Sequence, residues 1–435
     1  MGHAARVAPM RDYCSGLLLD CERKSAEPIA AATAPNATSA KHQSLLHFLA
    51  KGEWSDEKVL GKVRNLVLPQ MDRHGPVEAW IVDDTSFPKC GSHSVGVSHQ
   101  YCGQLGKQAN CQVAVLLSVA NHAASLPVAY RLYLPESWAK DDERRRQAGV
   151  PDEVEFQTKP NIALQQIECA CAAGIARGVV EMDCAYGSDL SLRLRLTALD
   201  LTYAVGVWAR TLVRKAEPGT DKPVTAADLA KSLSKRAWRT IGWRDGTNAR
   251  LVSRFARVRV RAADEGTTSE EPEEWLIVEW PKGEKEPTKF WLSTLAEDIS
   301  FEHMIDITMM RLRIERDYQE LKQEVGLGHF ERRSWRGFHH HATMCIAAYG
   351  FLVAERGAFP PSAPRSRYVS EKPALPQGYR PRGSPLRPER HVAHSIRYSP
   401  PSPQCRPPHA PLALPLLRQT HANQPSTLEL MTQYD

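Results

Sequence analysis

The sequence predicts an α/β fold with an additional helical region at its N-terminus, and three observations support this prediction. Short apolar runs with strand character alternate with helical segments between residues 77 and 207. Residues 208–293 alternate charged and apolar side chains with the period of strands. Helical periodicity dominates before and after these two regions. With 435 residues, the chain is long enough for two or three structural units and a sizeable core.

Residues 1–76 are predicted to be a helical N-terminal region. A polar break at 35–39 separates two helical segments, and Ser55 is the expected N-cap of a further helix that continues through Val67. Several short helices before a catalytic core are typical of a DNA-binding module. A subdomain that only packs against the core fits the same pattern equally well.

Residues 77–207 are predicted to form the first part of the core. The expected strands are 79–85, 112–120, 127–135, 178–183 and 201–207, with helices at 160–174 and 190–199. This order of three strands, helix, strand, helix, strand is that of a ribonuclease-H-like α/β core. The first strand is expected to end at Asp83 and Asp84, and the fourth at Asp183.

Residues 208–293 are predicted to be a mainly β insertion between the last core strand and a later helix that carries a glutamate. Strands are expected at 255–261, 274–280 and 289–294. Alternating arginines in the first of them indicate one exposed, basic sheet face. The tryptophans of this region are candidates for stacking on unpaired bases, although tryptophans more often belong to a core.

Residues 294–358 are predicted to supply the C-terminal helices of the core. In the helix at 311–322, four side chains fall on one stripe: Arg311, Glu315, Tyr318 and Lys322. Taken alone, such a stripe is more often a solvated face with an ion pair than a functional site. Residues 359–435 hold 16 of the 31 prolines and are predicted to be a disordered Pro/Arg-rich tail.

The net charge of +6 is not spread over the chain. The tail holds ten Lys/Arg and four Asp/Glu, so residues 1–359 are neutral, with 46 basic and 46 acidic side chains. Nucleic-acid binding must therefore depend on local clusters such as Arg311, Arg313, Arg316 and Lys322. No apolar run long enough for a membrane span and no signal peptide is present, and the ten scattered cysteines indicate a reduced, intracellular protein.

Three carboxylates could act together. Two-metal phosphoryl transfer needs two Mg²⁺ ions about 3.5–4 Å apart, held by oxygen ligands. Asp83 and Asp183 at strand ends and Glu315 on a helix could supply these ligands. Acids at strand ends are common, and on spacing alone Asp84 is as good a candidate as Asp83.

Several segments together carry a resemblance to a known family. They are Trp80–Lys89, His93–Val97, Gln100–Gly103, Asn110–Gln112, Leu132–Trp138, Asp183–Gly187, Arg313–Lys322 and Ser334–His341. On these motifs the chain, from about Asp12 to about Ile396, resembles the DDE transposases of the 701 family of bacterial insertion sequences. That family is related to the insertion sequence 4 group.

The resemblance implies which acids are catalytic. It selects Asp83, the first acid of the Asp-Asp-Thr motif, and Asp183 of the Asp-x-x-Tyr-Gly turn. The wider group's Tyr-x2-Arg-x3-Glu-x6-Lys signature fits Arg311, Glu315 and Lys322, and so favours Glu315 over Glu320 or Glu324. The tyrosine position of that signature is Thr308 here, so a role of that tyrosine in holding DNA is not supported.

The resemblance also implies cut-and-paste transposition. Two Mg²⁺ ions, for which Mn²⁺ can substitute, would be held by the three acids. A water molecule would cleave each element end, and the released 3′-OH would attack target DNA in line. Partners would be the double-stranded terminal inverted repeats, the target DNA and a second copy of the chain, in the bacterial cytoplasm at the nucleoid. Two alternatives are an impaired relic that only binds element ends and a ribonuclease-H-like nuclease without strand transfer.

The remaining candidates have simpler explanations. Arg311, Lys322, Arg316 and Lys89 are expected DNA contacts, although for Lys89 an ordinary surface position is about as plausible. His339, His340 and His341 point in different directions on a helix, which favours local packing over metal binding.

The tail lacks the family's Arg-rich and Cys-rich ending, so we expect a reading-frame slip near Ile396. By the same resemblance, we expect the N-terminus to be shorter than usual for the family.

Overall fold

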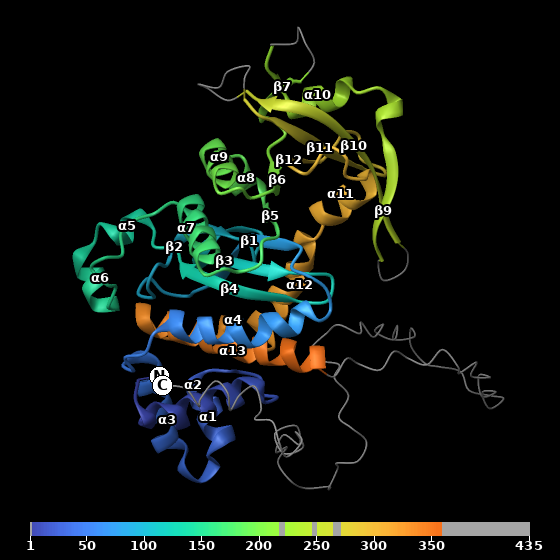
Figure 1. Ribbon diagram of the computed structural model, residues 1–435. Helices are drawn as coiled ribbons and strands as arrows, with labels where there is room; N and C mark the ends of the chain where they lie inside the picture. Colours follow the sequence, from blue (N-terminus) through green and yellow to red (C-terminus); the bar gives the residue numbers. More distant parts are fainter. Residues whose placement is uncertain (1, 217–221, 246–249, 264–270, 359–435) are drawn as a thin grey trace, which may run out of the picture.

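The computed structural model of this protein describes residues 2–216, 222–245, 250–263 and 271–358 (Figure 1). The predicted disordered tail lies outside the described residues. Helices pack on both faces of one large mixed sheet, which confirms the predicted α/β class. None of the helices in the described part of the chain is long and apolar enough to cross a membrane.

The N-terminal region is helical, as predicted. It contains α1 (Val7–Leu18), α2 (Ala26–Thr33), α3 (Thr38–Ala50) and α4 (Asp56–Asp72), with 3-10 turns at Ala4–Arg6 and Pro35–Ala37. The Ser55 hydroxyl accepts a hydrogen bond from the Lys58 N–H at 3.2 Å and so caps α4. These helices lie below the sheet in Figure 1, and α1, α3 and α4 pack against the last helix, α13 (Trp335–Ala358).

The first half of the sheet contains six strands. They are β1 (Ala79–Pro88), β2 (Ser98–Cys102), β3 (Lys107–Ala120), β4 (Ser125–Leu132), β5 (Val179–Met182) and β6 (Tyr203–Val207). The helices between them are α5 (Glu136–Ala139), α6 (Asp142–Ala148), α7 (Lys159–Ala172), α8 (Cys184–Gly187) and α9 (Leu190–Ala198). Strands β1, β5 and β6 are parallel neighbours, and β3 pairs antiparallel with β1.

One predicted boundary is wrong in this half, and one strand was not predicted. Strand β1 does not end at the two aspartates but continues to Pro88, because β3 pairs with it along its full length and buries Thr85, Ser86 and Phe87. Strand β2 lies within the Gly- and Ser-rich segment for which we predicted no strand. Its polar residues pair only with β3, at an edge of the sheet, where an apolar run is not needed.

The second half of the sheet continues the first without interruption. Its elements are β7 (Leu212–Lys215), β8 (Val224–Thr225), α10 (Ala226–Ser232), a 3-10 turn (Lys235–Ala237), β9 (Arg239–Asp245), β10 (Arg250–Ala262), β11 (Glu273–Pro281) and β12 (Lys289–Ser293). Strand β12 pairs antiparallel with β6, which gives the order β2-β3-β1-β5-β6-β12-β11-β10-β7-β8. Two strands lie outside this order: β4 pairs with β3, and β9 pairs with β10.

The predicted exposed basic face of β10 is wrong. Arg257 and Arg259 alternate on one face as expected, but both guanidinium groups stack on the ring of Trp275, at 4.6 and 4.8 Å. Glu273 forms ion pairs with Arg259 and Arg261, at 3.2 and 2.7 Å. This face is half-buried and largely neutralised, because aromatic and acidic side chains of the neighbouring strand cover the arginines.

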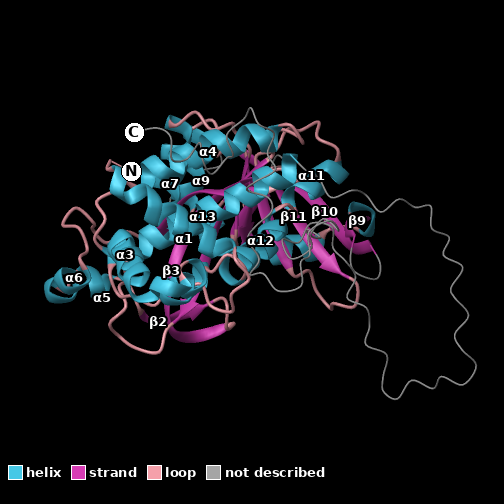
Figure 2. Ribbon diagram, turned by 90° about the horizontal axis from the view of Figure 1, so that it is seen from below, coloured by secondary structure: helices cyan, strands magenta, loops and turns pink. Residues whose placement is uncertain are grey.

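The C-terminal helices complete the layer on the lower face of the sheet. They are α11 (Phe301–Thr308), α12 (Arg311–Gln323) and α13, with a 3-10 turn at Leu327–His329. Helix α7 packs on the upper face, and α4 and α13 lie on the lower one (Figure 1). Figure 2, a view from below, shows α1, α3 and α13 over the strands. One continuous apolar core joins the N-terminal helices, β1 and α13, with Tyr13, Phe48, Trp80 and Phe338 among its members.

Candidate active site

Asp83 and Asp183 lie on neighbouring parallel strands. The register of β1 and β5 pairs Ile81 with Glu181, two residues before each aspartate. Because side chains two residues apart share a face of a sheet, both carboxylates lie at the same level on the same face. Asp183 is also the N-cap of α8, where its Oδ1 accepts the Ala185 N–H at 2.9 Å. The fold therefore fixes the position of both carboxylates through backbone contacts.

Arg311, the first residue of α12, lies between the two aspartates. Its Nη2 is 3.1 Å from Asp83 Oδ1 and 4.0 Å from Asp183 Oδ2. The structure thus brings together three predicted site residues from β1, β5 and α12. The guanidinium group neutralises part of the repulsion between the two carboxylates.

The pKa of Asp83 is raised to about 6. Burial is the main cause, since it disfavours the charged form, and the neighbouring charges of Asp183 and Asp84 add to it. Arg311 acts in the opposite direction and lowers the pKa. A positive charge next to Asp83 therefore stabilises the ionised form of this carboxyl group, whether the charge belongs to an arginine or to a metal ion.

Asp84 faces the other side of the sheet. Its Oδ2 accepts a hydrogen bond from Lys159 Nζ of α7 at 2.5 Å, and its Oδ1 accepts one from the Tyr186 hydroxyl. Because successive side chains of a strand face opposite sides of the sheet, Asp83 and Asp84 lie on different faces. The spacing of the acids in the sequence could not distinguish between them. Of the two, Asp83 is the one beside Asp183 and Arg311.

The predicted stripe on α12 faces the sheet rather than solvent for most of its length. The Tyr318 hydroxyl is hydrogen-bonded to Ser118 Oγ of β3 at 3.1 Å, and Lys322 Nζ lies 5.8 Å from the centre of the Phe87 ring. Glu315 is exposed, and its charge acts on Arg311 one turn earlier. The surface ion-pair interpretation thus fails for Tyr318 and Lys322, because both lie against the sheet.

Glu320, the alternative acid on this helix, points elsewhere. Its carboxylate is 5% exposed and lies 3.5 Å from Arg316 Nε, and its charge acts on Tyr349 of α13. Arg316 is therefore on a different side of α12 from Arg311. Lys89 Nζ donates a hydrogen bond to the Phe330 carbonyl at 2.6 Å, so this ammonium group is already engaged within the protein.

The two aspartates suit a divalent cation by their chemistry. Asp83 and Asp183 converge on one cationic atom, Arg311 Nη2, and carboxylate oxygens are the ligands that Mg²⁺ prefers. Within the described residues, no group of three or more His, Cys, Asp or Glu side chains is close enough to hold a metal ion. The fit thus rests on the aspartate pair, and Glu315 is not in place beside them.

The three consecutive histidines of α13 pack in the interior. His339 Nδ1 lies 2.9 Å from the Trp335 carbonyl, His340 Nδ1 lies 2.8 Å from the Leu49 carbonyl, and His341 Nε2 lies 3.0 Å from the Gly326 carbonyl. Their different directions agree with the packing interpretation. Burial lowers the pKa of each to about 4.

Thr308 also belongs to the interior. It is 3% exposed, and its hydroxyl donates to the Met304 carbonyl at 2.7 Å within α11. Among the tryptophans of residues 208–293, Trp208 is the most exposed, with 45% of its surface accessible. It follows β6 directly, beside the strand that delivers Asp183, and its backbone N–H donates to Ser188 Oγ at 3.1 Å.

Sequence reasoning missed Glu181. This residue of β5 is 1% exposed, and its Oε2 accepts the backbone N–H of Arg311 at 2.6 Å. The signal was its position two residues before Asp183, which places it on the same face of the strand. Glu181 was overlooked because its neighbours in β5 are apolar, and the whole segment was therefore interpreted as an apolar strand.

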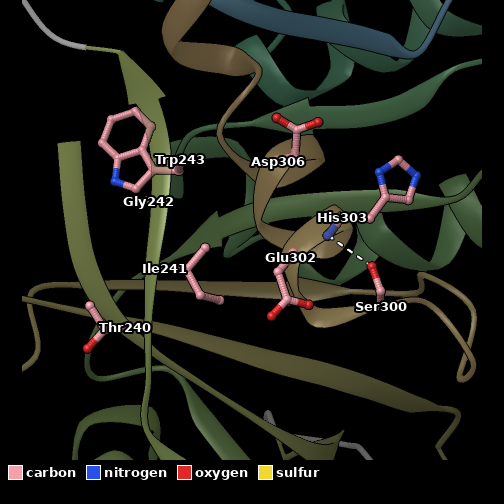
Figure 3. A pocket seen from close by; sticks show the side chains of 8 residues that line it. All are labelled: Thr240, Ile241, Gly242, Trp243, Ser300, Glu302, His303 and Asp306. Carbon is pink, nitrogen blue, oxygen red and sulfur yellow. Dashed lines mark hydrogen bonds between the residues drawn. The ribbon is translucent and has the colours of Figure 1, made fainter. Parts of the chain in front are cut away.

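The cavity in Figure 3 lies elsewhere. It has a volume of about 570 Å³ and lies between β9 and the start of α11. Its lining residues are Thr240, Ile241, Gly242, Trp243, Ser300, Glu302, His303 and Asp306. None of them is a predicted site residue.

Comparisons with known proteins identify the family of the chain. The family described as DDE superfamily endonuclease matches residues 1–250, a range that includes both aspartates but ends before α12. A protein of Microchaete diplosiphon named "Probable transposase for insertion sequence element IS701" is 31% identical over 193 residues. That similarity covers 44% of this chain and 46% of the relative, so the chain matches about half of the relative's length. Because the family match spans more than half of the chain, this protein belongs to the DDE superfamily endonucleases.

Proposed function

We propose that this protein is a DNA transposase that cleaves the ends of an insertion sequence and joins them to target DNA. The observation that carries the proposal is the convergence of Asp83 and Asp183, from parallel neighbouring strands, on one cationic atom. Family membership and the similarity to a transposase of insertion sequence element IS701 support it. In this proposal β1, β3, β4, β5 and β6 with their helices form a ribonuclease-H-like core.

In the proposed domain arrangement, residues 77–207 and 294–358 together form the catalytic core. Residues 208–293 are the mainly β insertion, and residues 1–76 are the helical region that precedes the core. The contacts of β12 with β6 favour an insertion that extends the core sheet rather than a separate unit. The protein would act in the bacterial cytoplasm at the nucleoid, as a dimer that pairs two element ends.

Asp83 and Asp183 would hold Mg²⁺ or Mn²⁺, with Glu315 as the third ligand. When bound, the cations would activate the attacking hydroxyl and stabilise the leaving oxygen of the phosphodiester. Arg311 already lies between the aspartates, and it would turn to the phosphate of the end being cut. Lys322, further along α12, would contact the next phosphates. Arg316 and Lys89 are weaker candidates, because both have partners within the protein.

Cleavage of labelled element-end DNA in Mg²⁺ or Mn²⁺ tests the proposal. We expect the wild type to cut at the element end, and the variants Asp83→Ala, Asp183→Ala and Glu315→Ala to bind the DNA without cutting it. Glu320→Ala is the matched control on α12 and should retain cleavage. Loss of cleavage in Glu320→Ala but not in Glu315→Ala would overturn the assignment on this helix.

The same experiment separates the alternatives. Binding without cleavage by the wild type would identify an impaired relic that only occupies element ends. Cleavage without joining, when a supercoiled target is added, would identify a nuclease that lacks strand transfer.

A further inference from the structure

Glu181 is a buried carboxylate in the centre of the sheet. It lies on β5, flanked by Ile81 of β1 and Ala204 of β6, and only 1% of its surface is exposed. An acidic side chain in such a place is costly unless it makes a specific contact. The mechanism proposed above does not use it.

The contact of Glu181 is with the start of α12. Its Oε2 accepts the backbone N–H of Arg311 at 2.6 Å. The first N–H groups of a helix have no partner within the helix, and a side-chain oxygen just before the helix usually satisfies one of them. Met310, which precedes α12, has no side-chain oxygen and makes no such bond. Glu181 therefore caps α12 from another element of the fold.

This cap ties α12 to the strand of the candidate active site. Asp183 lies two residues after Glu181 in the chain, and the Arg311 guanidinium reaches both Asp83 and Asp183. Arg311 is thus held twice, by its backbone through Glu181 and by its side chain through the aspartates. Glu315 follows one helical turn later, so the same cap also fixes where Glu315 lies along α12.

We propose that Glu181 is a positioning residue, which fixes the first turn of α12 so that Arg311 reaches the two aspartates. The inference rests on the proposed function. Glu181 does not itself bind a metal ion or DNA, because one of its oxygens is bonded to the Arg311 N–H and the side chain is enclosed. Its other oxygen, Oε1, is buried and makes no hydrogen bond among the described residues.

Two substitutions separate positioning from metal binding. Glu181→Gln keeps an oxygen that can accept the Arg311 N–H, whereas Glu181→Ala removes it. We expect Glu181→Ala to slow single-turnover cleavage of element-end DNA about tenfold to a hundredfold, in line with the cost of leaving the partly buried Arg311 N–H without an acceptor. Its Kd for the DNA should stay within about threefold of the wild type. Glu181→Gln should retain most of the cleavage rate, at an unchanged Mg²⁺ requirement.

Glu279→Ala is the matched control for loss of stability. Glu279 is a carboxylate of the same sheet, 3% exposed and paired with Lys289 at 3.4 Å, but it lies on β11 rather than beside α12. The Glu279→Ala substitution should lower the melting temperature and leave the cleavage rate of the folded protein unchanged. Equal slowing by Glu279→Ala and Glu181→Ala would show a general structural effect and overturn the inference. A second result would also overturn the inference. If Glu181→Gln is as slow as Glu181→Ala and needs more Mg²⁺, Glu181 is a ligand of the metal ion.

Amide hydrogen exchange tests the cap without relying on activity. A peptide that covers residues 309–315 should exchange at least tenfold faster in Glu181→Ala than in the wild type, and at the wild-type rate in Glu279→Ala. Unchanged exchange in Glu181→Ala would refute the cap. If the wild type cleaves no DNA but this exchange pattern holds, the proposed function fails while the cap stands.

Discussion

At the scale of single residues, we propose that Asp84 contributes to the fold rather than to the chemistry. Its carboxylate holds Lys159 of α7 and the Tyr186 hydroxyl, on the face of the sheet opposite Asp83. We therefore expect Asp84→Asn to lower stability by about 1–3 kcal/mol, the usual cost of disturbing a partly buried charged contact. DNA cleavage by the folded protein should fall less than about tenfold. Thermal melting and single-turnover cleavage would measure both effects, and complete loss of cleavage in a stable Asp84→Asn protein would contradict the assignment of Asp83.

We expect Arg311 to compete with a metal ion for the two aspartates. Its guanidinium lies 3.1 Å from Asp83, where it offsets the repulsion between the two carboxylates. Removing it in Arg311→Ala leaves two carboxylates without a counter-charge, which should strengthen Mn²⁺ binding to the DNA-free protein by about tenfold. The same variant should cleave DNA more slowly, since the phosphate contact is lost.

Calorimetric titration with Mn²⁺ measures this competition directly. Arg316→Ala is a suitable control, because Arg316 is paired with Glu320 on another side of α12. Weaker Mn²⁺ binding in Arg311→Ala would show that the arginine organises the aspartates rather than competing for them.

At the scale of elements, the turn after Asp183 allows no side chain at Gly187. A Cβ atom there would lie 2.2 Å from the Gly206 carbonyl oxygen on β6, far inside contact distance. Gly187→Ala must displace α8, and Asp183 is the N-cap of that helix. We expect lower stability and at least a tenfold loss of cleavage, measured by thermal melting and single-turnover kinetics.

Gly61 offers the matched control for this substitution. It lies inside α4, and the nearest atom to an added Cβ is the flexible end of Arg64 at 3.5 Å. Gly61→Ala should stabilise the protein by about 0.5–1 kcal/mol, because alanine favours the helix. Gly187→Ala with wild-type stability and activity would show that β6 can move away from the turn at little cost.

Each of the three buried histidines of α13 should contribute less to stability as the pH falls. The pKa values of His339, His340 and His341 are lowered to about 4, mainly by burial, from an ordinary value of 6.5. Between pH 6.5 and 4 the unfolded chain binds more protons at these sites than the folded one, so their contribution to stability falls as the pH falls through this window.

Buried carboxyl groups act in the opposite direction. Burial raises the pKa of Asp56 to about 7, that of Asp83 to about 6 and that of Glu181 well above its ordinary value, so the folded state holds protons that the unfolded chain releases. These groups offset most of the proton difference at the histidines, so the net pH dependence of stability between pH 6 and 5 should be small. The contribution of His341 is isolated by His341→Gln, which removes one site worth about 1.4 kcal/mol per pH unit. In urea unfolding at pH 6 and 5, the difference in free energy of unfolding between the wild type and His341→Gln should shrink by about this amount as the pH falls. A difference that does not change with pH would show that His341 is not buried in the neutral form.

The sequence predicted elements well where one rule governed the residues. Apolar runs located β1, β5 and β6, and Ser55 located the start of α4. It failed where pairing decided instead: β2 is polar but lies along the edge of β3, and β1 continues beyond Asp84 because β3 buries that segment. In the candidate site, neighbouring strands made the meeting of Asp83 with Asp183 predictable. The contact of Glu181 with the Arg311 N–H was not, since it joins residues 130 positions apart.

At the scale of the whole molecule, the N-terminal helices and the catalytic core share one interior. The two explanations for residues 1–76 were a DNA-binding module and a packing subdomain, and the contacts favour packing. Gly350 of α13 lies so close to Val63 and Val67 of α4 that an added Cβ would be 3.0 and 3.2 Å from them. The Tyr13 hydroxyl is hydrogen-bonded to His341 Nδ1 at 2.8 Å, inside the same apolar cluster.

A chain that begins at residue 77 should therefore not fold into a stable core. Removing α1 to α4 exposes the face of α13 that includes His340, His341 and Met344, and it leaves His340 without the Leu49 and Trp54 carbonyls that it contacts. We expect residues 77–358 to be aggregated or rapidly degraded by protease, whereas residues 1–358 remain resistant. Circular dichroism, gel filtration and limited proteolysis of the two chains would measure this difference. A cooperative thermal transition in residues 77–358, together with loss of DNA binding alone, would instead make residues 1–76 an independent DNA-binding module.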